Sequence, residues 1–355
     1  MSYERALADE QPAKASQAPE PVVADTGPSE RSISLGERVR SPQTIISFVV
    51  AFAIIIVVFW RLDIDFADVW SQIRNADPFY LALAFAAYYG SFPLRALRWR
   101  YILANAKISR EYGYNVPGIV GLSEIYILSW FVNCVVPAKL GDAYRGYLLK
   151  KQAGASFSKT LGTIFAERLL DVVALVGLML VSGLLVFHGT VPSGLRWWFV
   201  AGAALVVIGI GGLVALMTVS HRIEALLPER FQPYYNRLSD GIVSSFSRQG
   251  FSKVAGLTIL IWALEGARVY FGANALGIEL NISQSIFIAL LASLLTTFPF
   301  TPAGMGVVEG GTVFALRLFD VTAASATAAA LLDRTIASYS VVLFGGLLYF
   351  ISKRK

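Results

Sequence analysis

Long apolar stretches without charged residues alternate along this chain with short polar connections. A helix that crosses the hydrocarbon core of a membrane, about 30 Å thick, needs about 20 mostly apolar residues. The pattern therefore predicts an all-α polytopic membrane protein with about six full transmembrane helices. They are expected at residues 44–60, 78–94 with an extension through Trp99, 172–195 with a preceding helical stretch from Ser158, 197–220, 254–276 and 331–352.

Two further apolar stretches, residues 117–138 and 281–308, are interrupted by prolines and glycines. Both residue types interrupt helices, because proline lacks the backbone N–H and glycine costs backbone entropy. Non-helical backbone at membrane depth is tolerated only where protein buries it or where it lines a wet cavity. These stretches predict two re-entrant helical hairpins; the alternative is a kinked full span. The turns are expected at Pro137 and Gly141 in the first hairpin and at Pro299, Pro302, Gly304 and Gly306 in the second.

Residues 1–43 differ from the rest of the chain. They hold seven acidic and five basic residues without a periodic apolar face, which predicts a disordered cytoplasmic tail. The first apolar run begins only at Thr44, so no cleaved secretory signal is expected.

The composition narrows the class of protein. The residues are 55% hydrophobic and 15% charged, whereas soluble domains carry roughly 25% charged residues, so an ordinary soluble enzyme is excluded. The net charge of +6 then favours a membrane surface over nucleic acid as the partner. One cysteine, Cys134, excludes an internal disulfide, and with only two histidines no metal site or cofactor is expected.

The basic residues test the predicted topology, since lysine and arginine accumulate in cytoplasmic loops. With six spans, two hairpins and a cytoplasmic N-terminus, 24 of the 30 basic residues fall on the cytoplasmic side. If both hairpins were full spans, the basic stretch 139–168 would move outside. The distribution therefore favours hairpins, with both termini in the cytoplasm.

The chain also resembles itself. Residues 137–141, Pro-Ala-Lys-Leu-Gly, match residues 302–306, Pro-Ala-Gly-Met-Gly, at an offset of 165, and Arg168 and Arg334 follow at an offset of 166. Each half reads span, span, hairpin, span, in opposite membrane orientation. This predicts two membrane repeats, residues 44–196 and 197–355, in an inverted-topology arrangement typical of transporters.

Charged residues within the membrane segments are the candidate functional residues. Each costs about 2.5–3.5 kcal/mol on insertion scales, so it is expected to be paired or to line a polar path. Glu265 and Arg268, three residues apart, share one helix face, either as a structural ion pair or as a gate. Arg98, beside Arg95 and Arg100, either anchors its helix at the interface or binds an anionic headgroup.

The remaining candidates gather at the two predicted hairpins. Residues at the cytoplasmic hairpin are expected to form a polar cluster, although a solvated helix entry would also explain the acidic residues before the third span. The cluster comprises Lys139, Asp142, Arg145, Glu167, Arg168 and Asp171, and its counterpart at the outer hairpin comprises Glu309, Asp333 and Arg334.

Three motifs follow one another in a recognisable order. They are Asn133-x3-Pro137-Ala138-Lys139-Leu140-Gly141-Asp142-x2-Arg145, then Ala166-Glu167-Arg168-Leu169-Leu170-Asp171, and then Pro299-x2-Pro302-Ala303-Gly304-Met305-Gly306-x2-Glu309. Together they resemble the lysylphosphatidylglycerol synthase transmembrane-region family, also called flippase-like domain or UPF0104 proteins. Asp142 stands where family members often have Glu, and Ala303 where Gly is common. The resemblance covers roughly residues 44–350 and adds Asn133 to the candidate translocation residues.

The resemblance implies a multi-pass protein of the bacterial inner membrane that moves or handles lipids. We therefore expect a lipid flippase or scramblase for a polar-headgroup lipid: an aminoacylated phospholipid, a polyprenyl-phosphate glycolipid or a hopanoid-type lipid. The alternatives are an ion-coupled secondary transporter of a small polar solute and a non-transporting membrane subunit of lipid or glycan synthesis. No enzymatic activity is expected, because the chain lacks a phosphate-binding glycine loop, a GxSxG motif and an HExxH motif. Membrane lipids are the expected partners, with lipid- or glycan-synthesis enzymes as a second class; the oligomeric state stays open.

Overall fold

The computed structural model describes residues 41–61, 65–136, 140–187, 189, 193–246, 250–296 and 301–352. Within these ranges the chain is helical and contains no strand, which confirms the predicted all-α class. The helices are α2 (Pro42–Arg61), α3 (Phe66–Arg74), α4 (Pro78–Asn105), α5 (Ile119–Val135), α6 (Leu140–Ala153), α7 (Phe157–Val186), α8 (Ser193–Leu226), α9 (Gln232–Ser245), α10 (Phe251–Ala275), α11 (Ile282–Leu295), α12 (Val307–Arg317), α13 (Ala323–Arg334) and α14 (Ser340–Ile351). Short 3-10 turns lie at Arg110–Tyr112 and Pro302–Gly304, and a π-helical turn, Thr335–Tyr339, joins α13 to α14.

Polar residues fix the starts of several helices. The side chain of Asp77 accepts the Phe79 amide at 2.8 Å, directly before α4 and its first residue, Pro78. The Ser156 hydroxyl accepts the Lys159 amide at the start of α7, and Asn281 and Gln284 form a reciprocal capping box at the start of α11. Such caps satisfy amides that have no partner within the helix. They fix where α4, α7 and α11 begin.

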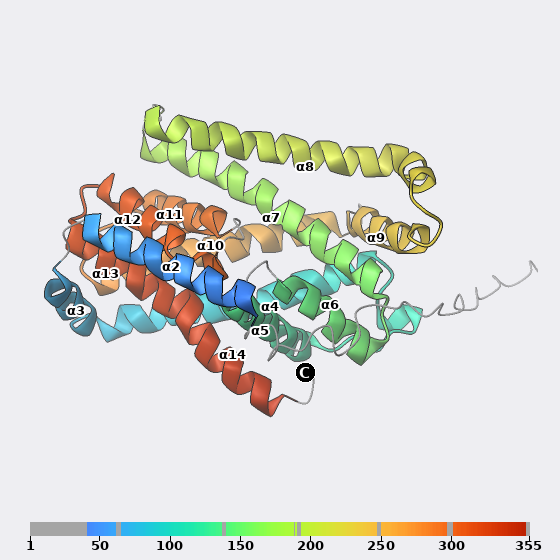
Figure 1. Ribbon diagram of the computed structural model, residues 1–355, viewed down its shortest axis with the longest axis horizontal. Coiled ribbons are helices and arrows are strands. Elements are labelled where there is room, and N and C mark those ends of the chain that lie inside the picture. The colour runs from blue at the N-terminus through green and yellow to red at the C-terminus, as the bar shows by residue number, and fades with distance from the viewer. Residues whose placement is uncertain are drawn as a thin grey trace, which may run out of the picture.

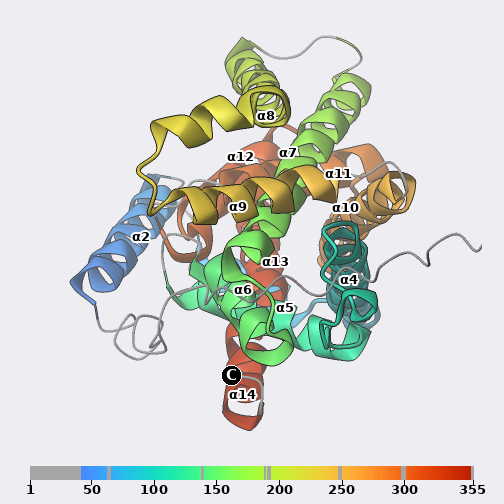
Figure 2. The ribbon, with the colours of Figure 1, turned by 90° about the vertical axis from the view of Figure 1, so that its right-hand side faces the viewer.

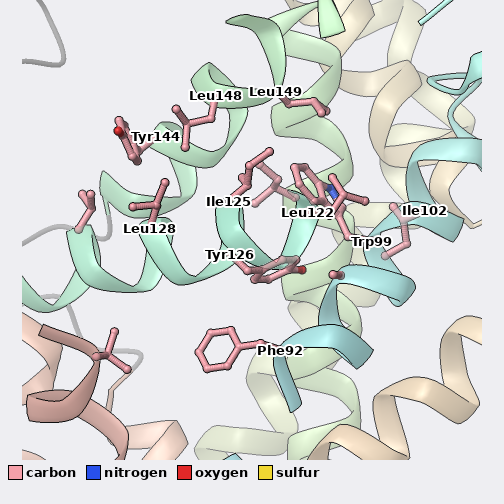
Figure 3. Close-up of a cluster of buried hydrophobic side chains, with 14 of the residues drawn as sticks. Phe92, Trp99, Ile102, Leu122, Ile125, Tyr126, Leu128, Tyr144, Leu148 and Leu149 are labelled. Carbon is pink, nitrogen blue, oxygen red and sulfur yellow. The ribbon is translucent and has the colours of Figure 1, made fainter. Parts of the chain in front are cut away.

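The helices form a bundle around α4 and α10, which pack along one another (Figure 1). Helices α5 and α6 pack together beside α4, and α11 and α12 pack together beside α10. Helix α7 contacts both groups, and α8 lies along α7 at the edge of the bundle (Figures 1 and 2). The apolar core between α4, α5 and α6 includes Trp99, Tyr126 and Leu148 (Figure 3).

In the described part of the chain, three helical segments are long and apolar enough to cross a membrane: Phe157–Val186, Phe251–Ala275 and Ala323–Ile351. Shorter apolar helical segments lie at Thr44–Ile54, Ile119–Val135, Val200–Leu216 and Ile282–Leu295. The structure thus agrees with a multi-pass membrane protein. The number of six full spans and the re-entrant course of the two interrupted stretches stay predictions.

The structure changes two predicted helix ends and defines one connection that the sequence left open. The predicted span 172–195 is wrong at its end, because α7 stops at Val186 and Leu195 already belongs to α8. The second span continues well past Leu94 as α4, which ends at Asn105. The connection 221–253, left open as a helix or a loop, contains α9, and α9 packs against α7.

Two glycines allow the close crossing of α7 and α9. A Cβ on Gly162 would lie 2.3 Å from the carbonyl oxygen of Leu238, and one on Gly241 would lie 2.3 Å from the carbonyl oxygen of Lys159. Backbone atoms cannot move aside as a flexible side chain can. The crossing therefore requires both residues to lack a side chain.

Gly162→Ala is expected to lower the free energy of unfolding by about 1–3 kcal/mol, because the added methyl group forces α7 and α9 apart. The thermal midpoint of the purified protein in detergent measures the effect. Gly177→Ala, on the same helix, is the matched control. No atom lies within 4 Å of its added Cβ, so its midpoint should stay or rise. Equal midpoints for the two variants would contradict the close-crossing interpretation.

Candidate functional site

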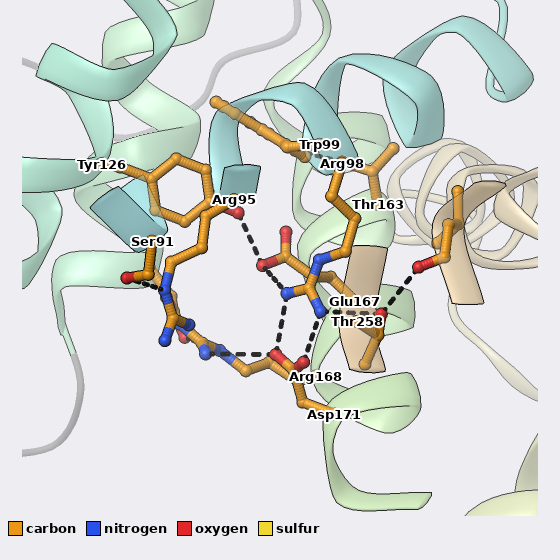
Figure 4. Close-up of polar contacts among 12 residues, drawn as sticks. Ser91, Arg95, Arg98, Trp99, Tyr126, Thr163, Glu167, Arg168, Asp171 and Thr258 are labelled. Carbon is orange, nitrogen blue, oxygen red and sulfur yellow. Dashed lines mark hydrogen bonds and ion pairs between the residues drawn. The ribbon is translucent and has the colours of Figure 1, made fainter. Parts of the chain in front are cut away.

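Glu167 of α7 lies at the centre of a buried polar network (Figure 4). Its Oε1 lies 2.9 Å from Nη2 of Arg98, and its Oε2 lies 3.1 Å from Nη2 of Arg145. The Tyr126 hydroxyl also donates to Oε1, at 2.6 Å. All four residues have a relative exposure of 0%. Two guanidinium groups and a hydroxyl thus compensate one carboxylate in a site closed to solvent.

Arg98 connects three helices through its guanidinium. Besides Glu167, it donates to both carboxylate oxygens of Asp171, at 2.6 Å and 3.0 Å, and to the Thr258 hydroxyl at 3.0 Å. Figure 4 shows the Arg98 guanidinium between the two α7 carboxylates, with Thr258 of α10 close by. Helices α4, α7 and α10 are therefore joined by one side chain.

Arg145 of α6 is held by aromatic rings as well as by charge. Its guanidinium carbon lies 4.6 Å from the ring centroid of Trp99 and 4.4 Å from that of Tyr126. Such contacts contribute most when water is excluded. The Nε atoms of both Arg145 and Arg98 are buried without a hydrogen-bond partner, so the network is not fully satisfied.

The junction between α5 and α6 carries a second set of polar contacts. The Asn133 side chain accepts the Gly141 amide at 2.8 Å, and the Ser129 hydroxyl donates to the Gly141 carbonyl oxygen at 2.8 Å. A Cβ on Gly141 would lie 2.0 Å from the Ser129 carbonyl oxygen, so only glycine fits there. One residue later, Asp142 accepts two hydrogen bonds from Arg168 of α7, at 2.9 Å and 2.7 Å.

In the second half of the chain, Glu265 of α10 lies between two arginines. Its Oε1 is 2.6 Å from Nη2 of Arg95 on α4, and its Oε2 is 3.1 Å from Nε of Arg268. Arg268 in turn pairs with Asp333 of α13. The predicted pair of Glu265 and Arg268 is present, and both partners bind a further helix.

Glu309 and Arg334, the candidates at the second interrupted stretch, both bind backbone atoms of the turn before α12. Nε of Arg334 lies 2.9 Å from Glu309 Oε1, and its Nη2 donates to the Ala303 carbonyl oxygen at 2.7 Å. Glu309 Oε2 accepts the Gly306 amide at 2.6 Å. Ala303, Gly304 and Gly306 have φ angles of 51°, 72° and 85°, so this turn includes left-handed backbone that favours glycine. The pair of Arg334 and Glu309 thereby stabilises this non-helical turn, because Arg334 binds the Ala303 carbonyl oxygen and Glu309 binds the Gly306 amide.

Two ion pairs of the first half recur in the second half at similar offsets in the sequence. Arg168 with Asp142 corresponds to Arg334 with Glu309, at offsets of 166 and 167. Arg98 with Glu167 corresponds to Arg268 with Asp333, at offsets of 170 and 166. The pair of Arg168 with Asp142 joins α6 to α7, and the pair of Arg334 with Glu309 joins α12 to α13. The pair of Arg98 with Glu167 joins α4 to α7, and the pair of Arg268 with Asp333 joins α10 to α13.

The structure brings most sequence-predicted site residues together in this network. Lys139, Pro137 and Pro299 lie outside the described residues, and Pro302 and Gly304 form the turn that Arg334 contacts. The interfacial-anchor interpretation of Arg95 and Arg98 is wrong, because both side chains are buried within the bundle. A solvated helix entry is likewise wrong for Glu167 and Asp171, which are buried.

The sequence pattern did not identify several residues that contact the network, among them Trp99, Tyr126, Trp130 and Thr258. An aromatic side chain in an apolar helix carries no local sign that it will face an arginine from a helix distant in sequence. Among the described residues, no group of three or more His, Cys, Asp or Glu side chains is arranged to hold a metal ion.

Comparison with known proteins identifies the family. Residues 46–345 match the family model described as "Lysylphosphatidylglycerol synthase TM region". The match covers most of the chain and all of the network described above. The chain therefore belongs to this family of membrane proteins.

Three archaeal proteins illustrate the range of relatives. A UPF0104 membrane protein of Methanocaldococcus jannaschii is 35% identical over 63% of this chain and 95% of its own length. A UPF0104 membrane protein of Methanothermobacter thermautotrophicus is 24% identical over 80% of this chain and 86% of its own. The glycosyltransferase AglD of Haloferax volcanii is 29% identical over 80% of this chain, which spans only 50% of AglD. Since these relatives are archaeal, the location in a bacterial inner membrane stays a prediction.

Glu167→Gln is expected to lower the free energy of unfolding by about 3–5 kcal/mol, because Arg98 and Arg145 lose a buried counter-charge. Thermal unfolding in detergent measures the loss. Asp240→Asn removes a carboxylate that pairs with Lys159 and is 53% exposed, so its effect should stay within about 1 kcal/mol. A Glu167→Gln variant as stable as Asp240→Asn would show that the network does not hold the helices together.

Proposed function

We propose that this protein is a lipid flippase or scramblase that moves a lipid with a polar headgroup across the membrane. The lipid classes that fit are an aminoacylated phospholipid, a polyprenyl-phosphate glycolipid and a hopanoid-type lipid. The single observation that carries the proposal is the buried network of ion pairs, which connects α4, α7, α10 and α13. Charges at this depth in a membrane protein are costly and are typically found along substrate and ion pathways.

The recurrence of two ion pairs supports an inverted repeat of residues 44–196 and 197–355. In this proposal, the α5–α6 and α11–α12 pairs are re-entrant hairpins that enter from opposite sides of the membrane. The Asn133 side chain accepts a backbone amide at the α5–α6 junction, and the buried Arg334 donates to a backbone carbonyl at the turn before α12. Alternating access would then consist of one half moving against the other around the central α4–α10 pair.

Partner exchange gives a physical route for such a movement. Arg98 contacts both Glu167 and Asp171, and Arg268 contacts both Glu265 and Asp333. A helix can therefore shift while each arginine keeps one carboxylate. The polar headgroup would pass along this network while the acyl chains stay in the lipid.

The proposal includes no chemical reaction, so the chain would be a transporter rather than an enzyme. Net movement would be driven by a lipid gradient, a coupled ion or the membrane potential. The potential supplies about 2.3 kcal/mol per elementary charge for each 100 mV. That is enough to bias the distribution of a charged headgroup.

A second candidate follows from the likeness to AglD. That relative is named a glycosyltransferase, and this chain corresponds to half of its length. A chain similar to part of a glycosyltransferase would fit a membrane subunit that supports glycan synthesis without transport. Translocation by the purified chain alone separates this candidate from the flippase.

The hairpin topology predicts opposite accessibility for two matched positions, Leu140 and Met305, which are 165 residues apart. In a Cys134→Ser background, Leu140→Cys is expected to react with a membrane-impermeant maleimide from the cytoplasmic side. Met305→Cys is expected to react from the outside. Arg110→Cys and Arg74→Cys, at exposed positions, mark the inside and the outside. Labelling of both test positions from one side would rule out hairpins of opposite orientation.

Proteoliposomes that contain the purified chain alone are expected to accelerate transbilayer movement of a fluorescent lipid. The probes are phosphatidylglycerol, phosphatidylethanolamine and a polyprenyl-phosphate sugar, each with a reporter that dithionite quenches in the outer leaflet. Arg145→Ala, Glu167→Gln, Arg168→Ala, Glu265→Gln and Arg334→Ala should each slow the preferred probe by about tenfold or more, which corresponds to about 1.4 kcal/mol of barrier.

Asp240→Asn is the control, because its carboxylate lies outside the network. Each variant must first elute as a folded species in size-exclusion chromatography. Full rates in all five folded variants would contradict the site assignment. An inactive wild-type chain with every probe would favour the non-transporting subunit.

A further inference from the structure

The six arginines of the network differ sharply in accessibility. The side chains of Arg95, Arg98, Arg145, Arg268 and Arg334 are 0–8% exposed, whereas that of Arg168 is 31% exposed. Its partner Asp142 is also the most exposed acid of the network, at 19%. The Arg168–Asp142 pair is therefore the most accessible pair of the network.

Arg168 presents the geometry that recognises an oxyanion. Its Nε donates to Asp142 Oδ2 at 2.9 Å, and its Nη2 donates to Asp142 Oδ1 at 2.7 Å. This two-pronged arrangement fits two oxygens of a phosphate as well as those of a carboxylate. The carboxylate of Asp142 thus lies where two phosphate oxygens would bind.

The ring of Trp130 supports the same guanidinium independently of Asp142. The guanidinium carbon of Arg168 lies 5.3 Å from the Trp130 ring centroid, and that of Arg95 lies 5.1 Å from it. Stacking on a ring orients a guanidinium without using its N–H donors. Arg168 therefore has support that does not depend on Asp142, both from Trp130 and from Asp171, whose Oδ2 lies 3.8 Å from its Nη1.

Asp142 can leave Arg168 at lower cost than the other acids can leave their partners. It lies in the first turn of α6, where the helix dipole stabilises a negative charge. It is also partly exposed, so water can solvate the released carboxylate. Glu167, in contrast, has no exposed surface and would be left as a buried charge.

We infer that Arg168, stacked on Trp130, is the binding site for the phosphate group of the substrate, and that Asp142 occupies the site when no substrate is bound. This inference rests on the proposed function and defines its substrate class as molecules with a phosphate mono- or diester. The phosphate can belong to a lipid headgroup or to a soluble ester. The substrate phosphate displaces Asp142, and the carboxylate returns when the substrate leaves.

Binding to the full chain in phosphate-free maltoside micelles tests the inference. The probes are phosphatidylglycerol, inorganic phosphate, glycerol 3-phosphate and, as a phosphate-free lipid, a glucosyl diacylglycerol. Arg168→Ala and Arg168→Lys are expected to weaken phosphatidylglycerol binding about tenfold, because neither variant retains the bidentate fork. Asp142→Asn is expected to tighten binding about threefold or more, because the competing carboxylate is gone. Trp130→Ala should weaken binding more than Trp130→Phe.

Two variants control for charge. Lys159→Ala removes a cation from the same helix, and Asp240→Asn removes its partner carboxylate; neither belongs to the network. Both should bind phosphatidylglycerol as the wild type does. Thermal midpoints confirm that all variants are folded.

The outcomes separate the sources of the phosphate and the two proposals. Tighter binding of phosphatidylglycerol than of the soluble probes supports a lipid headgroup, and equal binding supports a phosphate site that takes a soluble ester. Unchanged or weaker binding in folded Asp142→Asn, or equal binding of the phosphate-free lipid, overturns the inference. The micelle experiment measures binding and not translocation. A chain that binds phosphate but does not move lipid would therefore contradict only the flippase proposal. A chain that moves lipid without the expected effects of the Arg168 and Asp142 variants would contradict only the phosphate site.

Discussion

The whole arrangement depends on the cost of a charge within a membrane-spanning bundle. An arginine or a glutamate at this depth is stable only when an opposite charge and hydrogen bonds replace its water. Each buried arginine of the network meets this condition with an acid from another helix, as in Arg95 with Glu265, Arg98 with Glu167 and Arg334 with Glu309. The same pairs therefore fix the relative positions of α4, α7, α10, α12 and α13, and they place charged groups within an otherwise apolar bundle.

The two halves use this principle in similar but unequal ways. The pair at the interrupted stretch, Arg168 with Asp142, and the pair between long helices, Arg98 with Glu167, recur in the second half at offsets of 166 to 170. Arg145 has no counterpart, since the residue 165 positions later is Gly310. Arg95 and Glu265, at an offset of 170, occupy matching positions and bind one another across the α4–α10 contact. The two halves thus differ around these pairs, with more cationic and aromatic groups at Glu167 than at Asp333.

The sequence predicts those features that depend on neighbouring residues. Apolar run length locates most helices, and the spacing of three between Glu265 and Arg268 correctly predicts their contact. The polar clusters expected at the two interrupted stretches contain the pairs of Asp142 with Arg168 and of Glu309 with Arg334, although the sequence does not predict which residues pair. The predicted end of α7 is wrong because residues 187–195 carry no Asp, Glu, Lys or Arg, so the absence of charge does not mark the end of the helix. The burial of Arg95 and Arg98 depends on acids 170 and 69 residues away, and no local pattern carries that information.

The balance of charges bears on how a proposed transporter would respond to the membrane potential. Six arginines face six acids in the described network: Asp142, Glu167, Asp171, Glu265, Glu309 and Asp333. A helix movement that keeps these pairs together carries little net charge through the field, so the protein itself would contribute little gating energy. Any dependence of the proposed translocation on voltage would then come from the headgroup and from a carboxylate or guanidinium that it displaces. Because Asp142 and Arg168 are the most accessible pair, displacement there would change the charge balance of the path while the buried pairs stay intact.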